Sequence, residues 1–88
     1  MQVLYTANAS ASAGRSGRVS SDDGIVDFAL VVPQGMGGPG GAGTNPEQLF
    51  ASGYSACFAG ALKLVAGMQK VVTGPVTISA AVSIGKDA

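Results

Sequence analysis

The sequence contains no histidine and no tryptophan, and its only cysteine is Cys57. Without histidine the chain has neither a Ser-His-Asp triad nor a Cys-His pair for nucleophilic catalysis. One cysteine and no histidine also exclude a standard zinc site, which needs several such ligands. An internal disulfide is excluded for the same reason. We therefore expect no metal ion and no cofactor, and any thiol chemistry belongs to Cys57.

Charged residues are also scarce. Five basic and five acidic residues give a formal net charge of zero, and charged residues make up 11% of the chain. A chain without a basic patch is a poor partner for nucleic acid or an acidic membrane. The hydrophobic content of 47% is typical of a globular protein. So little charge also suggests that another subunit covers part of the surface.

The length of the chain predicts its domain organisation, and its first residues predict its location in the cell. Eighty-eight residues allow one domain, 1–88, with an adequate core. The N-terminus begins directly with a strand pattern and shows no signal peptide. We therefore expect a cytoplasmic, reducing location.

The first third of the chain predicts an antiparallel meander. Small apolar residues alternate with polar ones, and phenylalanine, leucine and valine alternate further on, which is typical of half-buried strands. Gly14–Gly17 reads as a turn, and Asp23-Gly24 is a hairpin signal. The expected strands are residues 3–13, 18–20 and 25–32.

A glycine-rich loop, residues 34–43, follows Pro33. Because it leads toward a helix, a phosphate cradle is one interpretation. The spacing, however, matches neither a P-loop nor a dinucleotide-binding fingerprint. We therefore favour a flexible lid or a crossover connection, and a nucleotide-binding protein remains the weakest alternative.

Residues 43–70 carry the only long helical pattern. Thr44 and Asn45 are good N-cap residues, Pro46 suits the first turn, and Thr44-x-x-Glu47 matches a capping box. Apolar or small residues then occupy nearly every face, which predicts a buried central helix. A span of about 20 such residues is long enough to cross a membrane. Its serines, Lys63 and flanking strand patterns favour a soluble helix with no membrane partner.

Gly53, Gly60 and Gly67 recur at seven-residue intervals on nearly one face of this helix. Each glycine costs about 1 kcal/mol relative to alanine, so a close neighbour should compensate. That neighbour is either a sheet of the same chain or the same helix of a partner chain. After the helix, residues 76–84 alternate again and predict a fourth strand, so the fold class is α+β.

Thiol chemistry at Cys57 requires a cation that favours the thiolate. The helix dipole fades within the first turn, and Cys57 lies about ten residues inside the helix. Elimination among the five basic residues leaves Arg15 or Arg18, next to the predicted turn between strands. A carboxylate is needed to orient that arginine, and Glu47 is the candidate. The structural alternatives are a core cysteine and a simple capping acid.

The run GPGGAGTNPEQLFASGYSACF, together with GRSGR and VLYTANASA, resembles the organic hydroperoxide resistance proteins of the OsmC/Ohr superfamily. The resemblance spans essentially the whole chain and implies an OsmC-like fold. It implies that Cys57 is the peroxidatic nucleophile, that Arg15 is the catalytic arginine and that Glu47 is the catalytic glutamate. It also implies an organic hydroperoxide substrate and a dihydrolipoyl protein as the dithiol reductant. A homodimer is expected on separate grounds, from the glycine stripe, the low charge and the distance between Glu47 and Cys57.

Family members continue beyond the fourth strand and carry a resolving cysteine there, so this chain resembles their N-terminal part. A second hypothesis is therefore a non-catalytic dimeric module, or a thiol sensor that reacts once. Glu47 and Cys57 are about 15 Å apart along a straight helix and about 80° apart around it. We expect that the helix breaks near Gly53, that Arg15 moves, or that Glu47 serves the Cys57 of a partner chain.

Overall fold

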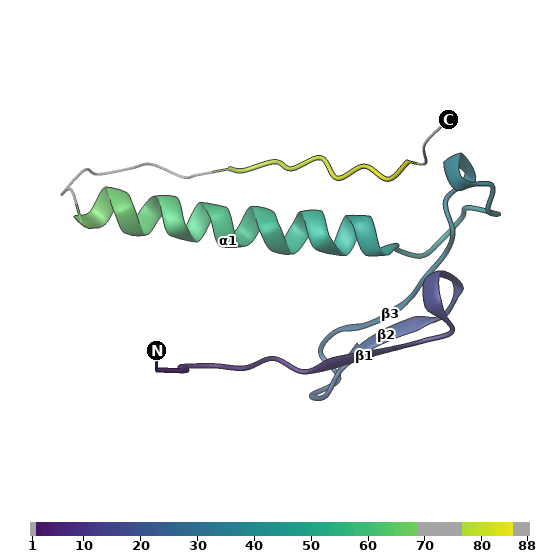
Figure 1. The fold of residues 1–88 in the computed structure, drawn as a ribbon, viewed down its shortest axis with the longest axis horizontal. Coiled ribbons are helices and arrows are strands. Elements are labelled where there is room, and N and C mark those ends of the chain that lie inside the picture. Colours follow the sequence, from purple (N-terminus) through teal and green to yellow (C-terminus); the bar gives the residue numbers. More distant parts are fainter. Residues whose placement is uncertain (1, 69–76, 86–88) are drawn as a thin grey trace. The chain divides into compact units, whose positions relative to one another are not determined.

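The computed structural model describes residues 2–68 and 77–85. It divides into two units, Met1–Pro46 and Glu47–Ala88, and each unit is described by itself. The first unit contains a three-stranded antiparallel sheet, in which strands that follow one another in the sequence are paired (Figure 1). Its strands are β1 (Ala9–Ser12), β2 (Arg18–Ser21) and β3 (Asp27–Ala29). The predicted meander is confirmed.

The register of the sheet separates an apolar face from a polar face. Ala11 pairs with Val19, and Val19 pairs with Phe28, so these three side chains share one face. The opposite face carries the serines of β1 together with the pairs Ser12–Arg18 and Ser20–Asp27. The alternation in the sequence therefore marks the two faces correctly.

Two of the strands are shorter than predicted. The first was expected over residues 3–13, but only Ala9–Ser12 has a full ladder partner. The third was expected over residues 25–32, but its ladder covers Asp27–Ala29. Alternation measures which face a side chain takes, whereas a strand also needs a paired backbone. The alternating pattern of the first and third strands therefore extends beyond the residues that pair with β2.

Both turns of the meander depend on glycine. In the β2–β3 hairpin Gly24 has φ 77°, and its N–H donates to the carbonyl of Ser21 at 3.0 Å. In the β1–β2 turn the chain forms a single 3₁₀ turn, η1 (Gly14–Ser16). A Cβ at the following Gly17 would lie 1.6 Å from the carbonyl oxygen of Ser12. Only glycine fits there, because the backbone passes too close for a side chain.

The glycine-rich segment is a crossover connection to the helix. It starts with a short 3₁₀ turn, η2 (Gln34–Met36), and folds back so that Gly40 N–H donates to the Val32 carbonyl at 3.1 Å. Leu30 forms a parallel bridge with Thr44 where the segment returns to the sheet. A Cβ at Gly43 would lie 2.3 Å from a Val31 methyl carbon, so this return also requires glycine.

The second unit contains α1 (Pro46–Met68), which confirms the predicted long helix. Asn45 precedes the first helical residue, and Pro46 takes the first position, where its missing N–H is not needed. The last two predicted residues, 69 and 70, lie outside the described part of the chain. The helix is longer than about 30 Å at 1.5 Å per residue.

The prediction that this helix is buried is wrong for the chain by itself. Phe50 is 64% exposed and Leu64 is 67% exposed. Among the described residues Leu30, at 5% exposure, is the one buried hydrophobic residue. The apolar pattern of α1 therefore identifies surface that needs a covering element, which the described residues do not supply.

The predicted fourth strand is also not formed. Of residues 76–84, Val76 lies outside the described residues, and 77–85 form no strand or helix. The half-buried positions Ile78 and Ala80 keep the expected alternation over the start of the segment. A strand requires a neighbouring backbone as partner, and the described residues provide none for this segment.

Candidate functional site

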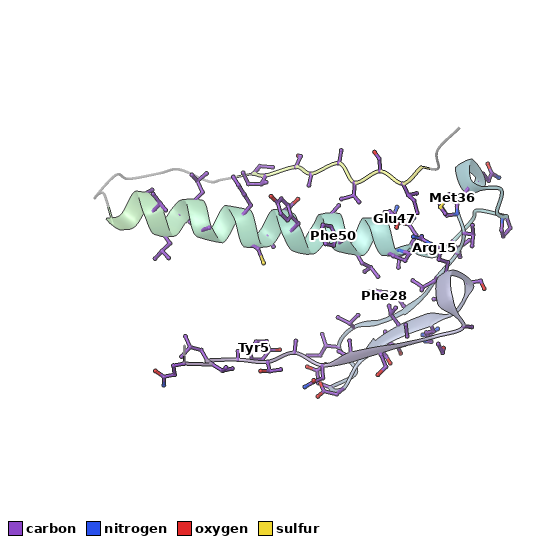
Figure 2. All side chains as sticks on the ribbon, viewed as in Figure 1. Tyr5, Arg15, Phe28, Met36, Glu47 and Phe50 are labelled. Atoms are coloured by element: carbon purple, nitrogen blue, oxygen red, sulfur yellow. The ribbon has the colours of Figure 1, made fainter. Side chains whose placement is uncertain are left out.

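Arg15 lies at the centre of the tight turn η1 (Figure 2). Ala13, immediately before this turn, adopts φ 57°, the left-handed conformation that non-glycine residues rarely take. Gly17 closes the turn by donating its N–H to the Gly14 carbonyl at 3.3 Å. The side chain of Arg15 is half-buried. The sequence Gly-Arg-Ser-Gly thus sets the backbone position of Arg15 at one end of the sheet.

Arg18, the other arginine that the sequence left as a candidate, forms an ion pair within the sheet. Its Nε donates to Oδ1 of Asp27 at 2.6 Å, across the β2–β3 pair. Because Arg18 pairs with Ala29 and Asp27 with Ser20, the two charged side chains are diagonal neighbours on the polar face. Arg18 is therefore committed to an ion pair within its own sheet.

The directions of the pKa shifts in the hairpin agree with an ion pair between Arg18 and Asp27. The hydrogen bond from Arg18, and then its charge, hold the pKa of Asp27 below its usual range, while the same contact raises the pKa of Arg18. The nearby Asp23 accepts hydrogen bonds from the Ser21 hydroxyl and the Ile25 N–H, which lower its pKa. Both side chains of the ion pair are about half exposed, so the pair contributes little to stability.

Glu47 occupies the first turn of α1 and is half-buried (Figure 2). A carboxylate at this position interacts favourably with the positive end of the helix dipole. The helix begins at Pro46, so Glu47 is its second residue. A capping box has its acid at the third helical position, so the predicted Thr44–Glu47 box is one residue out of register with this helix. The functional role of Glu47 stays a prediction.

Cys57 lies near the middle of α1, and its side chain is exposed. The helix is continuous from Pro46 to Met68, so it does not break near Gly53. This removes one of the three explanations for how Glu47 and Cys57 could serve one arginine. The two residues are about 15 Å apart along the axis and about 80° apart around it.

Three aromatic rings flank Cys57 on the same helix. The rings of Phe50 and Tyr54 stack with centroids 6.2 Å apart, and those of Tyr54 and Phe58 stack at 6.3 Å. All three side chains are at least half exposed. We call this row the aromatic ridge. In the sequence these three residues are not distinguished from the many other apolar residues of the helix. Their i, i+4 spacing is the signal that singles them out.

The helix also meets the length and composition test for a membrane span over Pro46–Gly67. The core helix of a soluble protein passes the same test. The aromatic ridge and Lys63 lie within this stretch, so the test alone does not assign α1 to a membrane.

Two of the three predicted site residues lie on one helix, and the third lies on a different element. Glu47 and Cys57 share α1, in the second unit. Arg15 belongs to the first unit, and each unit is described by itself. The continuous helix, the Arg15 turn and the Arg18–Asp27 pair are thus the geometric facts on which a mechanism rests.

Comparison with known proteins assigns the class. The family model of OsmC-like proteins matches residues 38–88, which include Glu47, Cys57 and the whole of α1. The chain belongs to this family. The relatives within it include organic hydroperoxide resistance proteins: one from Xanthomonas axonopodis pv. citri is 54% identical over 86 residues.

Solved structures of organic hydroperoxide resistance proteins are also similar to this chain. An organic hydroperoxide resistance protein from Legionella pneumophila superposes with a TM-score of 0.82 at 47% identity, covering 89% of this chain and 56% of that chain. One from Vibrio cholerae, with captopril bound in one of its active sites, gives a TM-score of 0.76 at 50% identity, covering 82% and 49%. The OsmC-like α+β fold is thereby confirmed.

The chain is shorter than these relatives. Its match to the Xanthomonas protein covers 97% of this chain but 61% of that protein.

Proposed function

We propose that the chain is a cysteine-based peroxidase of organic hydroperoxides that acts in oxidative-stress defence. The observation that carries the proposal is the exposed Cys57 on a continuous helix of an OsmC-like chain. The thiolate of Cys57 attacks the distal oxygen of the hydroperoxide, and a sulfur–oxygen bond forms as the oxygen–oxygen bond breaks. The leaving alkoxide takes a proton and departs as the alcohol, while the sulfur is left as a sulfenic acid.

Arg15 supplies the positive charge in this proposal. It stabilises the Cys57 thiolate and polarises the peroxide, and Glu47 orients its guanidinium. The Gly-Arg-Ser-Gly turn, which matches the family motif that carries the catalytic arginine, supports the choice of Arg15, while Arg18 forms an ion pair with Asp27 on the polar face of its own sheet. The sequence left these two arginines as alternatives.

The proposed working unit is a homodimer. Because α1 is continuous, a Glu47 side chain cannot cover the distance of about 15 Å to the thiol of its own helix. Either Arg15 moves between the two groups, or Glu47 acts with the Cys57 of the partner chain. The exposed apolar surface of α1 supports a partner chain, since burying it is favourable by about 25 cal/mol per Å².

The rest of the cycle is proposed from the resemblance. A dithiol such as a dihydrolipoyl protein reduces the oxidised cysteine, and the protein acts in the cytoplasm. A second candidate is an OsmC-like dimeric module or a thiol sensor that reacts once. In this candidate Cys57, the one cysteine among residues 1–88, reacts with a single oxidant molecule and is not turned over.

The choice of oxidant tests the proposal. We expect cumene hydroperoxide to oxidise Cys57 faster than hydrogen peroxide does, because the thiol is flanked by Tyr54, Phe58 and other apolar residues. The measurement is the rate of thiol loss under pseudo-first-order conditions with each oxidant. The chain unfolded in denaturant is the control, since it has the same thiol without the site. Equal slow rates with both oxidants, matching the unfolded chain, would show an inert cysteine.

A further inference from the structure

The turn that carries Arg15 has an unusual backbone. Ala13, just before the turn, has φ 57° and ψ 27°, and Gly14, its first residue, has φ 59°. Ala13 is the one residue other than glycine with a positive φ in the part of the chain that the structure describes. A left-handed alanine is strained, and such strain persists only where the surrounding structure holds the residue in place. The neighbours of the turn must therefore fix its shape.

Gly17, at the other end of the turn, lies against the end of β1. A Cβ at this position would be 1.6 Å from the Ser12 carbonyl oxygen, 2.6 Å from the Ser12 carbonyl carbon and 2.9 Å from the Ala13 Cβ. The two nearest atoms belong to the backbone, which cannot rotate away as a side chain does. The φ of Gly17 is −101°, which is not left-handed, so the requirement is for space. Gly14 and Gly24 differ, because a Cβ on either meets nothing within 4 Å.

Gly17 also connects the turn to the buried part of the sheet. Its N–H donates to the Gly14 carbonyl at 3.3 Å, and its carbonyl accepts a hydrogen bond from the Leu30 N–H at 2.8 Å. Leu30 is the buried hydrophobic residue of the described chain, at 5% exposure. Arg15 lies between Gly14 and Gly17, with one residue separating it from Gly17. A shift of Gly17 therefore moves the backbone of Arg15 relative to the sheet.

The size of that shift follows from ordinary contact distances. A carbon atom and a carbonyl oxygen that are not bonded to each other lie about 3.3 Å or more apart. A Cβ on Gly17 would start 1.6 Å from the Ser12 oxygen, so β1 and the turn would have to separate by more than about 1 Å. A displacement of about 1 Å at a reacting centre is enough to slow a reaction by about 100-fold.

We propose that Gly17 is a positioning residue: its missing side chain lets β1 close on the turn, and this close contact fixes where Arg15 lies. The inference rests on the proposed peroxidase function, in which Arg15 acts on the thiolate and the peroxide. Gly17 has no side chain with which to act on either group, so it acts through Arg15.

The test combines Gly17→Ala with Arg15→Lys in a double-mutant cycle. The measurement is the single-turnover rate constant for oxidation of Cys57 by cumene hydroperoxide. We expect Gly17→Ala to slow the unsubstituted chain by about 100-fold. In the Arg15→Lys chain it should slow the reaction by less than about twofold, because a residue that acts through the guanidinium has no effect once that group is gone. An equal loss in both backgrounds, or an unchanged rate constant in Gly17→Ala, would overturn the positioning role.

Gly24→Ala is the matched control. It adds one methyl group to the other turn of the same sheet, where φ is 77° and alanine is strained, and it leaves the Arg15 turn in place. We expect a less stable sheet, with the rate constant of the unsubstituted chain for the folded molecules. A loss in Gly24→Ala as large as that in Gly17→Ala would overturn the inference, because any disturbance of the sheet would then have the same effect.

A second variant covers the case in which Gly17→Ala does not fold. One glycine inserted between Ser16 and Gly17 lengthens the turn without a clash, and exposed turns tolerate such insertions. Because the insertion releases Arg15 from its fixed distance to Gly17, we expect the same loss of about 100-fold, again absent in the Arg15→Lys background. A normal rate constant in the insertion variant would overturn the role of the turn.

Trypsin separates a failure of this inference from a failure of the proposed function. Cleavage after Arg15 requires the turn to open, whereas cleavage after Arg18 requires β2 to open. We expect Gly17→Ala to raise the rate of cleavage after Arg15 by about tenfold, the effect of losing one or two backbone hydrogen bonds, and to change cleavage after Arg18 less. That result without any peroxide reaction would support the positioning of Arg15 and reject the peroxidase function. An unchanged cleavage pattern would overturn the positioning role whatever the peroxide rate.

Discussion

Replacing Arg15 with lysine should slow the oxidation of Cys57 by an organic hydroperoxide by about 100-fold, the usual effect of removing one well-placed donor from a reacting centre. An ammonium keeps the charge but loses the planar fork that engages a carboxylate while it faces the thiolate. Lysine also lacks the fixed direction of the guanidinium donors. The measurement is the single-turnover rate of thiol loss.

Arg18→Lys is the matched control for this substitution. It makes the same chemical change three residues away, at a side chain that already pairs with Asp27 at 2.6 Å. We expect a small change in rate and a slightly less stable hairpin, since exposed ion pairs contribute little. If Arg18→Lys were the damaging change and Arg15→Lys were mild, the assignment of the two arginines would be reversed.

Mixing two inactive variants should restore activity. A Cys57→Ser chain lacks the nucleophile, and a Glu47→Ala chain lacks the carboxylate that orients Arg15. Each should fail in single-turnover reduction of an organic hydroperoxide. If Glu47 acts on the partner's site, a mixed dimer holds one complete site and regains up to half the activity per dimer of the unsubstituted protein. The continuous helix is the reason to expect this, because it keeps Glu47 about 15 Å from the Cys57 of its own chain.

The state of assembly is the control for this experiment. Mixed dimers are separated by a tag on one of the two chains, and their mass is confirmed in solution before activity is measured. Restored activity in the mixed dimer, with both parents inactive, supports a shared site. A mixed dimer that forms but stays as inactive as its parents would show that each site is completed within one chain.

The sequence predicted local features well where short-range geometry decides them. The Asp23-Gly24 hairpin and the Gly14–Gly17 turn are present because left-handed or crowded backbone at these positions requires glycine. The helix begins at Pro46 as expected, because proline fits only the first turn. The two faces of the sheet are also correct, since alternation follows directly from the pleat.

The failures concern features that depend on other segments. Residues 77–85 alternate but form no strand, because a strand needs a neighbouring backbone that the sequence pattern does not report. Helix α1 was expected to be buried, yet Phe50 is 64% exposed, because burial depends on what covers the helix. For the site, spacing alone left Arg15 and Arg18 as alternatives. The ion pair of Arg18 with Asp27 could not be predicted either, because it depends on the register of β2 and β3.

The central claim is that Cys57 reduces an organic hydroperoxide by taking one oxygen atom. The direct measurement is the intact mass of the protein after reaction with one equivalent of cumene hydroperoxide, with dimedone added to trap sulfenic acid. The account predicts one dimedone adduct at Cys57, located by peptide mapping, with release of one equivalent of the alcohol and no adduct in Cys57→Ser. An unmodified protein with no alcohol released, or an adduct that forms equally in the denatured chain, would contradict it.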